Sequence, residues 1–372
     1  MEQWKEYKLG DIASLKYGKL PPKNNSGYYP IWSGYRYVGF ADSFNCKKGT
    51  IIVVARGVGG TGDVKFATQD CFLTNLSISV EIDYNICNPR YFYYLFQINN
   101  LRYLDSGSAQ SQITIEDLKR LQIYLPKLHQ QNKIVNLLSS LDDKIELNRR
   151  INDNLEQQAQ ALFDDMFFNN IELERYNLSN YADINPFRSI KKNSEARFIE
   201  MSNLPTHGSF PLNWDYKHYN GGMKFSNGDT IMARITPCLE NGKTAYIDFL
   251  DDNEVAFGST EYIVFSARNG YCPALFYYLA RNQEFIDYAI SHMNGSSGRQ
   301  RVSGNDIANF PMPHISKDSS DKFGIIVMPI MSIIQDNSIM NRALAQLRDT
   351  LLPRLMSGEL RISEIETEKN NG

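Results

Sequence analysis

The hydrophobic positions of the chain change their spacing in an order that occurs twice. In the first part, short runs of apolar and β-branched residues follow glycine turns, as in "KKGTIIVVARG" at residues 47–57. This pattern predicts short strands. After residue 126, apolar positions instead recur at alternating spacings of four and three, which predicts a long helix. A strand-rich segment and then a second helical segment follow in the same order.

The two halves also share local sequences. The stretch "CNPRYFYYLF" at residues 87–96 corresponds to "YCPALFYYLA" at residues 271–280, and each predicts an aromatic helix opened by a proline. A Gly/Ser/Gln-rich loop follows in each half, at residues 105–114 and 293–303. The chain is therefore predicted to be an internal repeat of about half its length.

Both helical segments carry a narrow apolar seam with asparagines inside it. A spacing of 3.5 indicates a coiled coil, and a seam asparagine fixes register and partner at some cost in stability. We therefore expect the two helices to pair with each other, although an amphipathic helix packed on its own domain would show a similar pattern. The predicted seam residues are Leu138, Leu141, Ile145, Asn148, Leu155 and Leu162 in the first helix, and Asn337, Leu344, Leu347 and Leu351 in the second.

The predicted fold class is α+β. Two tandem α/β domains are each followed by a long helix, and the helices pair as an antiparallel coiled coil with pseudo-twofold symmetry. The predicted segments are a first domain at 1–126, a helix at 127–170, a second domain at 171–316, a helix at 317–360 and a disordered tail at 361–372.

Composition limits the classes of function. The five cysteines are scattered without C-x-x-C spacing, which favours buried thiols in a reducing cytoplasm over disulfides or a zinc site. The five histidines are equally scattered, so no metal site is expected. No run of about 18 apolar residues predicts a membrane span. The net charge of −3 neither requires nor excludes nucleic acid.

Motifs that suggest catalysis are incomplete. Gly57, Gly59 and Gly62 follow a predicted strand as in a dinucleotide-binding loop, but the next residues alternate like a strand, and such a loop needs a helix there. "INPF" at residues 184–187 resembles part of an adenine methyltransferase motif but lacks its second proline. These absences favour a binding protein over an enzyme.

The repeated loops supply candidate DNA contacts. Glutamine can bond adenine and arginine can bond guanine through two hydrogen bonds each in the major groove. Glycine and serine allow a close approach to phosphates. A solvated loop joining two elements is the plainer interpretation, but the equivalent positions in both halves favour binding. The candidates are Arg56, Gln110, Ser111 and Gln112 in the first domain, and Arg234, Lys243, Arg299, Gln300 and Arg301 in the second.

The layout resembles the specificity subunits of type I restriction-modification systems. The resemblance rests on "WKEYKLGDIASLKYGK", on the stretch from "GSAQSQITIEDLKRLQIYLP" into "QQNKIVNLLSSLDDKIELNRRINDNLEQQAQALF", and on "NRALAQLRDTLLPRLMSGELRI". It covers nearly the whole chain.

The resemblance implies a non-catalytic bacterial subunit whose two domains each read half of a split DNA target. It implies two methyltransferase subunits as partners, with S-adenosylmethionine, and motor-nuclease subunits that use ATP and Mg. No cofactor is expected in this chain. The unlike loops of the two halves predict an asymmetric target. Two alternatives stay open: a coiled-coil scaffold without DNA preference, and an enzyme that binds a nucleotide at Gly57–Gly62.

Overall fold

The computed structural model describes residues 4–22, 27–57, 60–105, 111–169, 174–296 and 298–362. The chain divides into two compact units. Unit 1 contains Met1–Asp143 and Leu344–Gly372, and unit 2 contains Lys144–Ala343. Helices α4 (Leu128–Phe167) and α8 (Lys317–Met356) each contribute one end to unit 1 and the other to unit 2.

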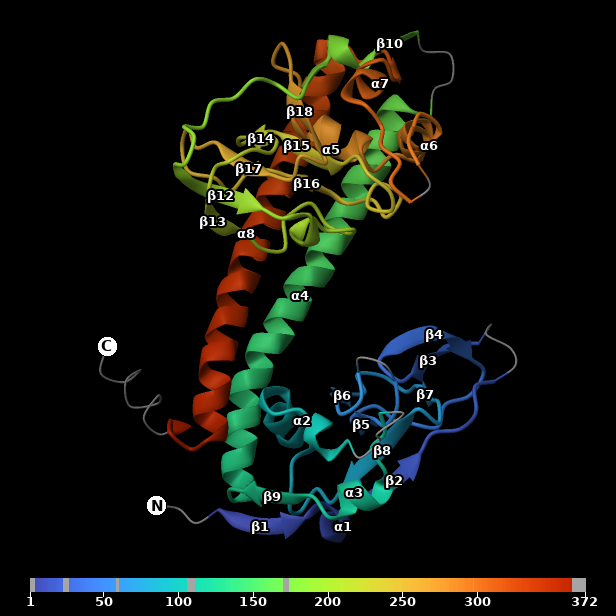
Figure 1. Ribbon diagram of the computed structural model, residues 1–372, viewed down its shortest axis with the longest axis vertical. Coiled ribbons are helices and arrows are strands. Elements are labelled where there is room, and N and C mark those ends of the chain that lie inside the picture. Colours follow the sequence, from blue (N-terminus) through green and yellow to red (C-terminus); the bar gives the residue numbers. More distant parts are fainter. Residues whose placement is uncertain are drawn as a thin grey trace. The chain divides into compact units, whose positions relative to one another are not determined.

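Unit 1 is built on two small sheets (Figure 1). One has the strand order β2-β8-β5-β6 and is antiparallel throughout, and the other has the order β4-β3-β7 with β3 and β7 parallel. A third pair, β1-β9, brings the start and end of the domain together. The elements are β1 (Lys5–Lys8), α1 (Leu9–Ile12), β2 (Ala13–Tyr17), β3 (Tyr29–Ser33), β4 (Arg36–Ala41), β5 (Ile51–Val54), β6 (Val64–Phe66), β7 (Phe72–Leu73), β8 (Ser77–Ile82), α2 (Pro89–Ile98), a 3₁₀ turn (Leu101–Leu104), α3 (Ile115–Lys119) and β9 (Gln122–Leu125).

Helix α2 confirms the predicted aromatic helix and fills the core of unit 1. Pro89 occupies its first turn, and the Asn88 side chain accepts hydrogen bonds from the backbone N–H groups of Arg90 and Tyr91. Tyr91 and Phe92 are fully buried against the apolar strand β5 and helix α4. The cap defines where the helix starts, and its start sets which aromatic side chains enter the core.

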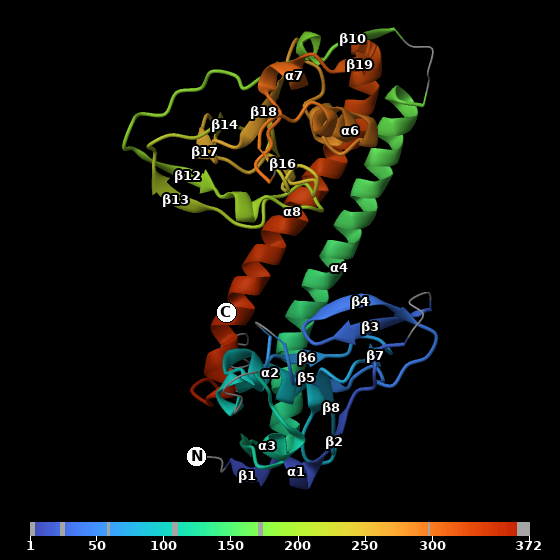
Figure 2. The same ribbon diagram turned by 45° about the vertical axis from the view of Figure 1, so that its right-hand side comes forward.

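Unit 2 repeats this topology (Figure 2). Its sheets have the orders β11-β18-β15-β16 and β13-β12-β17-β14, and the short pair β10-β19 again joins the ends of the domain. The elements are β10 (Arg175–Asn177), two 3₁₀ turns (Leu178–Asn180 and Met201–Asn203), β11 (Ala182–Ile184), β12 (Glu195–Ile199), β13 (Asp215–His218), β14 (Lys224–Phe225), β15 (Thr230–Ala233), β16 (Thr244–Tyr246), β17 (Ala256–Gly258), β18 (Tyr262–Ala267), α5 (Ala274–Leu279), α6 (Gln283–Ser291), α7 (Gly304–Ala308) and β19 (Pro311–Pro313).

The repeat extends to the details of helix capping. Helix α3 begins with a capping box between Thr114 and Asp117, and helix α7 begins with one between Ser303 and Asp306. In each box the hydroxyl accepts from the backbone N–H three residues on, and the carboxylate accepts from the backbone of the cap. The same local device therefore starts the equivalent helix in both domains.

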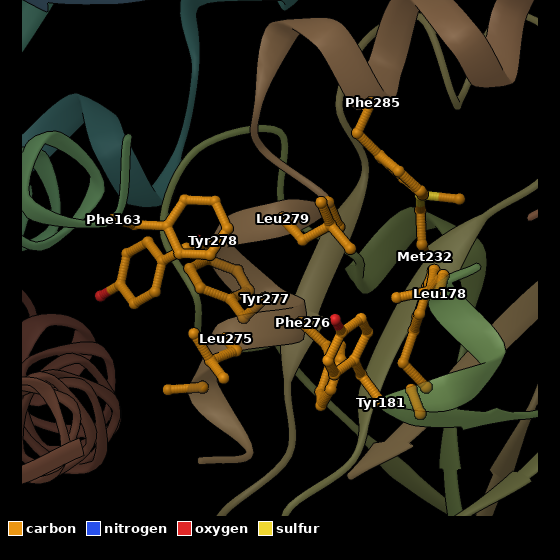
Figure 3. Packing of buried hydrophobic residues seen from close by; sticks show 14 of the residues in the cluster. Phe163, Leu178, Tyr181, Met232, Leu275, Phe276, Tyr277, Tyr278, Leu279 and Phe285 are labelled. Carbon is orange, nitrogen blue, oxygen red and sulfur yellow. The ribbon is translucent and has the colours of Figure 1, made fainter. Parts of the chain in front are cut away.

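Aromatic side chains join the second domain to both long helices. Tyr277 and Tyr278 of α5 are fully buried beside Phe163 of α4 (Figure 3), and Phe323 of α8 packs edge-on against Phe163 at 5.8 Å between ring centroids. Truncating a fully buried phenylalanine to alanine typically costs about 3–5 kcal/mol. The domain core of unit 2 thus includes one face of each helix.

The two long helices pair antiparallel through amide side chains, of which Asn148 is buried and the other three are half-buried. Asn148 Nδ2 donates to Asn341 Oδ1 at 2.9 Å, and one turn along, Asn337 Nδ2 donates to Asn152 Oδ1 at 2.8 Å. Asn152 Nδ2 also donates to the Ile334 carbonyl at 3.2 Å. In unit 1 the pairing continues with an ion pair between Arg348 and Asp142 at 2.9 Å. The predicted antiparallel pairing is confirmed.

The structure distributes the predicted seam residues unevenly. Leu138, Ile145 and Asn148 are buried, whereas Leu141, Leu155, Leu162, Asn337, Leu344 and Leu351 are half-buried. Leu347 departs from the prediction, because it is 48% exposed and lies on the outward side of α8. The apolar spacing predicted Leu347 in the seam because α8 is apolar on more than one side, and spacing alone does not distinguish these sides.

Both long helices begin and end within four residues of the predicted segments. Helix α4 covers Leu128–Phe167 where residues 127–170 were expected, and α8 covers Lys317–Met356 where 317–360 were expected. Most of the predicted disordered tail, from residue 363 on, lies outside the described residues.

Helix α8 has apolar residues on two sides. Phe323, Val327, Met331 and Ile334 are buried in unit 2, whereas Ile325, Ile326, Met328, Ile333, Ile339 and Met340 are exposed. Its most apolar 18-residue window has a mean hydropathy of 1.4 and meets the length and composition of a membrane span, although only 22% of that window is buried. An apolar side of a helix is stabilised when another surface covers it, and here only one of the two apolar sides is covered.

A buried carboxyl lies close to α8 in unit 2. The Asp248 backbone carbonyl accepts from Gln335 Nε2 at 2.6 Å, while its Oδ1 is buried and has no hydrogen-bond partner among the described residues. Burial raises the pKa of Asp248 to about 7, and the negative charge of Asp336 raises it further than burial alone would. The Asp248 carboxyl therefore gains a proton on folding near pH 6.

We predict that Asp248→Asn changes how the stability of the protein depends on pH. Because the pKa is raised in the folded state, the stabilisation is complete below the unfolded value near 3.8 and is lost as the pH rises through about 7. The loss is at most about 4 kcal/mol. Urea unfolding followed by circular dichroism at pH 5 and pH 8 should show Asp248→Asn to be more stable than the parent only at pH 8. The exposed Asp252→Asn is the control, and an equal effect in both variants would contradict the prediction.

Candidate functional site

In unit 1 the predicted loop lies beside the end of strand β5. Arg56 and Gln112 form an isolated antiparallel bridge, and the backbone N–H of Ile113 donates to the Ala55 carbonyl at 2.9 Å. The Ser111 hydroxyl and the Gln112 backbone N–H both donate to the Asp105 carboxylate. The structure therefore brings Arg56, Ser111 and Gln112 together, while Gln110 lies outside the described residues.

In unit 2 the corresponding loop lies beside the end of strand β15. Ile235 and Arg301 form the equivalent antiparallel bridge, and the Val302 N–H donates to the Arg234 carbonyl at 3.1 Å. Arg299 is exposed, and the described residues give its guanidinium no partner. Gln300 is half-buried, and its carbonyl accepts from the Thr236 N–H at 3.0 Å. Arg234 and the 299–301 loop therefore form one surface in this unit.

Glu261 holds two of the predicted arginines. Its carboxylate accepts three hydrogen bonds of 2.8–2.9 Å from Arg301, and the Arg234 Nε lies 3.9 Å away, beyond hydrogen-bond length. The hydrogen bonds from Arg301 lower the pKa of Glu261, which keeps its carboxylate charged. The side chain of Arg301 is therefore fixed in position, but its positive charge is largely neutralised by the Glu261 carboxylate.

Lys243 has a structural contact that the sequence pattern did not predict. Its Nζ donates to the Met201 carbonyl at 2.7 Å, and its own carbonyl accepts from the Ala233 N–H at 2.9 Å. Lys243 thus lies one residue from Arg234 across the β15-β16 ladder, but its ammonium is already engaged.

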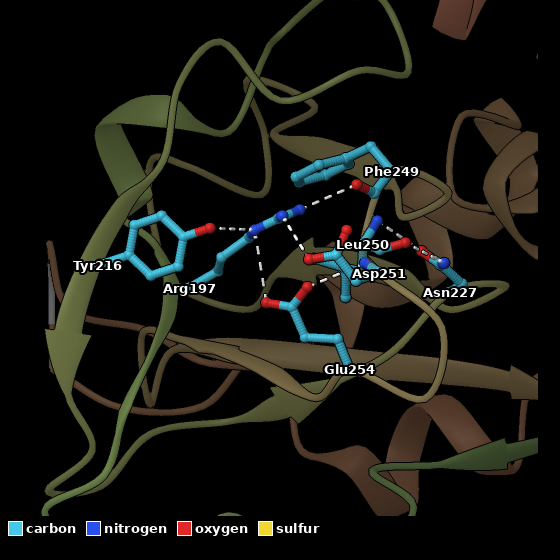
Figure 4. Close-up of polar contacts among 7 residues, drawn as sticks. All are labelled: Arg197, Tyr216, Asn227, Phe249, Leu250, Asp251 and Glu254. Carbon is cyan, nitrogen blue, oxygen red and sulfur yellow. Dashed lines mark hydrogen bonds and ion pairs between the residues drawn. The ribbon is translucent and has the colours of Figure 1, made fainter.

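A polar network centred on Arg197 was also missed by sequence reasoning (Figure 4). The Arg197 guanidinium donates to Tyr216 at 2.9 Å, to the Phe249 carbonyl at 3.0 Å and to Asp251 at 3.0 Å. Its partners lie 19 to 54 residues away in the chain, so no local pattern marks them. The network anchors strand β12 to the 249–254 turn below the second sheet.

The motifs that suggested a nucleotide enzyme have other roles in the structure. Strand β6, not a helix, follows Gly62, so no helix N-terminus is available at that point to hold a pyrophosphate. The Asn185 Oδ1 of "INPF" accepts the Val264 N–H at 2.9 Å, which ties β11 to β18. Within the described residues, no group of three or more His, Cys, Asp or Glu side chains could hold a metal ion.

Comparisons with known proteins show a similarity to one family. The family described as "Type I restriction modification DNA specificity domain" matches residues 1–157, which is less than half of the chain. Residues 1–157 are therefore similar to a type I specificity domain. The similarity extends beyond the matched residues, since the Type I restriction enzyme MjaIX specificity subunit of Methanocaldococcus jannaschii is 24% identical over 97% of this chain and 89% of its own length.

Two further relatives support the specificity domain and the fold. The HindI specificity subunit of Haemophilus influenzae is 31% identical, over 45% of this chain and only 41% of its own length. The crystal structure of the type I restriction-modification system S subunit from M. genitalium superimposes with a TM-score of 0.63 at 20% identity, covering 95% of this chain and 96% of that one. This agreement in fold confirms the predicted arrangement of two domains with paired helices.

Proposed function

We propose that the chain is the DNA specificity subunit of a type I restriction-modification complex and has no catalytic role itself. The observation that carries the proposal is the repeated site: Arg56 with its loop and Arg234 with its loop lie at the same position in two domains of the same topology. One domain would read each half of a split target. The domain match and the names of the relatives support this assignment.

The repeated site suits sequence readout because the two loops differ in chemistry. Ser111 and Gln112 offer hydroxyl and amide groups in the first domain, and Arg299 and Arg301 offer guanidinium groups in the second. Amide groups suit adenine and guanidinium groups suit guanine in the major groove. We therefore infer an asymmetric target.

Catalysis would come from partner subunits. We propose methyltransferase subunits that bind S-adenosylmethionine and translocase-nuclease subunits that use ATP and Mg, with this chain holding no cofactor. We also propose a cytoplasmic location, where DNA is accessible.

The exposed apolar side of α8 supports protein docking. Ile325, Ile326, Met328, Ile333, Ile339 and Met340 lie on the side opposite to the buried residues of the helix and extend for about four turns. Helix α4 adds Leu147 and Ile151, exposed and one turn apart. We propose that one methyltransferase subunit covers the α8 side and a second covers the α4 side, which would bury surface that is too apolar to stay in water.

The purified chain alone should neither methylate nor cut DNA, because catalysis is assigned to its partners. The measurement is incorporation of labelled methyl groups into a plasmid that contains the mapped target, with and without the methyltransferase subunits. Activity of the chain without a partner would contradict the proposal.

Replacing residues 171–316 with the corresponding domain of a relative should change one half of the target and leave the other half unchanged, because each domain reads alone. Sequencing that detects methylated adenine in cells with the exchanged chain measures both halves. Changes in both half-sites would rule out independent reading by the two domains.

Ile325→Glu should abolish co-purification with methyltransferase subunits. Ile325 is 76% exposed, so the charge should not unfold α8, whereas burying an unpaired carboxylate in an interface costs several kcal/mol. Asn213→Glu, on an exposed loop of the same unit, is the control for added charge. If Ile325→Glu still co-purifies with the methyltransferase subunits, this side of α8 is not the dock. The same conclusion follows if the parent protein is found in the membrane fraction.

A further inference from the structure

One face of the second sheet in unit 2 is separate from the domain core. In the sheet β13-β12-β17-β14, Phe198 pairs with Phe257 and Phe257 pairs with Lys224, so these three side chains share a face. The opposite face, which includes Ile199 and Ala256, packs in a buried cluster. On the Phe198 face Phe257 is buried, whereas Phe198 and Lys224 are half-buried and reach solvent.

This face carries a row of two lysine and four aromatic side chains. Lys217 Nζ lies 4.2 Å from the centre of the Phe198 ring, and Phe198 lies 5.0 Å from Phe257 between centroids. Tyr219 packs edge-on against Phe257 at 5.2 Å, and Lys224 Nζ lies 5.3 Å from Tyr219 and 5.7 Å from Phe187. We call these six residues the Lys–aromatic row. Such cation–aromatic contacts hold the lysine heads over the rings.

Phe187 ends the row and is 92% exposed. The segment that carries it, residues 185–194, contains Arg188, Lys191 and Lys192 and no acidic residue. The segment is fixed at its root, because Arg188 pairs with Asp229 at 2.5 Å and Lys224 Nζ donates to the Arg188 carbonyl at 2.7 Å. The anchored basic segment thus holds the Phe187 ring in solvent. The free energy that burial of this ring would contribute is therefore not gained on folding.

The first domain has an apolar residue exposed at the corresponding place. The segment between β2 and β3 corresponds to the one between β11 and β12, and in it Leu20 is 76% exposed. In the adjoining sheet, Ile31 pairs with Phe72 in parallel strands, as Phe198 pairs with Phe257. An exposed apolar side chain in this connecting segment is therefore common to both domains.

We propose that the Lys–aromatic row and the 185–194 segment form a second DNA contact of unit 2, in which Lys191 and Lys192 bind phosphates and Phe187 packs against the bases. This inference rests on the proposed function. Arg188 is paired with Asp229, and Asp215 lies opposite Phe198 on the same face, so the exposed Lys191 and Lys192 are the charges of this segment that suit a polyanion. An exposed ring suits a base step, because apolar side chains act as wedges between bases. Lys217 is less available, since Glu200 lies 3.9 Å from its Nζ.

Two variants of the full chain, assembled with its methyltransferase subunits, separate the two parts of the contact. Lys191→Gln/Lys192→Gln should lower the slope of log Kd against log salt concentration by about two, since each phosphate contact contributes about 0.9. Phe187→Ala should weaken binding by about fivefold to hundredfold with an unchanged salt slope, because stacking involves no counterion. Fluorescence anisotropy with a labelled duplex that contains the mapped target measures both.

Matched controls come from the same unit. Leu212→Ala removes an exposed apolar side chain outside the row, and Lys317→Gln/Lys322→Gln removes two exposed lysines of α8. Both should bind as the parent does, within twofold.

Three outcomes decide between the inference and the proposed function. If the parent complex does not prefer its target over a scrambled duplex, the proposed function fails. If the parent does prefer its target but both test variants bind as it does, the Lys–aromatic row is not a DNA contact. If the variants lose a methyltransferase subunit and keep their affinity for DNA, the face is a protein interface and the inference is overturned.

Discussion

The paired amides between α4 and α8 are the constraint on which the rest of the structure depends. Asn148 and Asn152 face Asn341 and Asn337 in the seam between the two helices. An unpaired buried amide costs about 1–3 kcal/mol, so sliding either helix by a turn would break several hydrogen bonds at once. The register of the helices is thereby fixed, and each domain core is completed by aromatic and aliphatic residues from both.

A fixed register explains why α8 can be apolar on two sides without losing its place. If packing depended on apolar contacts alone, the side with Ile325 and Ile333 could exchange with the side that carries Val327 and Met331. Asn337 and Asn341 lie on one side of α8, where they pair with the asparagines of α4. That side of α8 must therefore face α4. The remaining apolar side stays exposed, and under the proposed function it is the surface that a partner covers.

Sequence alone predicted the parts of the fold that depend on local signals. The proline-opened helix at Pro89, the repeat and the seam asparagines are readable because their partners recur at fixed spacing. The prediction that Leu347 lies in the seam was wrong. Helix α8 has two apolar sides, and the spacing of its apolar residues does not tell which side faces inward. Glu261 and the Lys–aromatic row could not be predicted, because their contacts join strands that are distant in the chain and pair through sheet register.

Under the proposed function, the pairing of Arg301 with Glu261 gives the two domains different means of reading DNA. Arg301 is held by three hydrogen bonds, so it loses little side-chain freedom on binding, but its charge is largely balanced. Arg56 is exposed, and no acidic partner for its side chain occurs among the described residues, so it keeps its full charge and its freedom. A fixed, balanced arginine suits base choice, whereas a free one suits phosphate attraction. Under the proposed function, attraction to DNA in the second domain therefore rests on the exposed Arg299 and on the exposed Lys191 and Lys192.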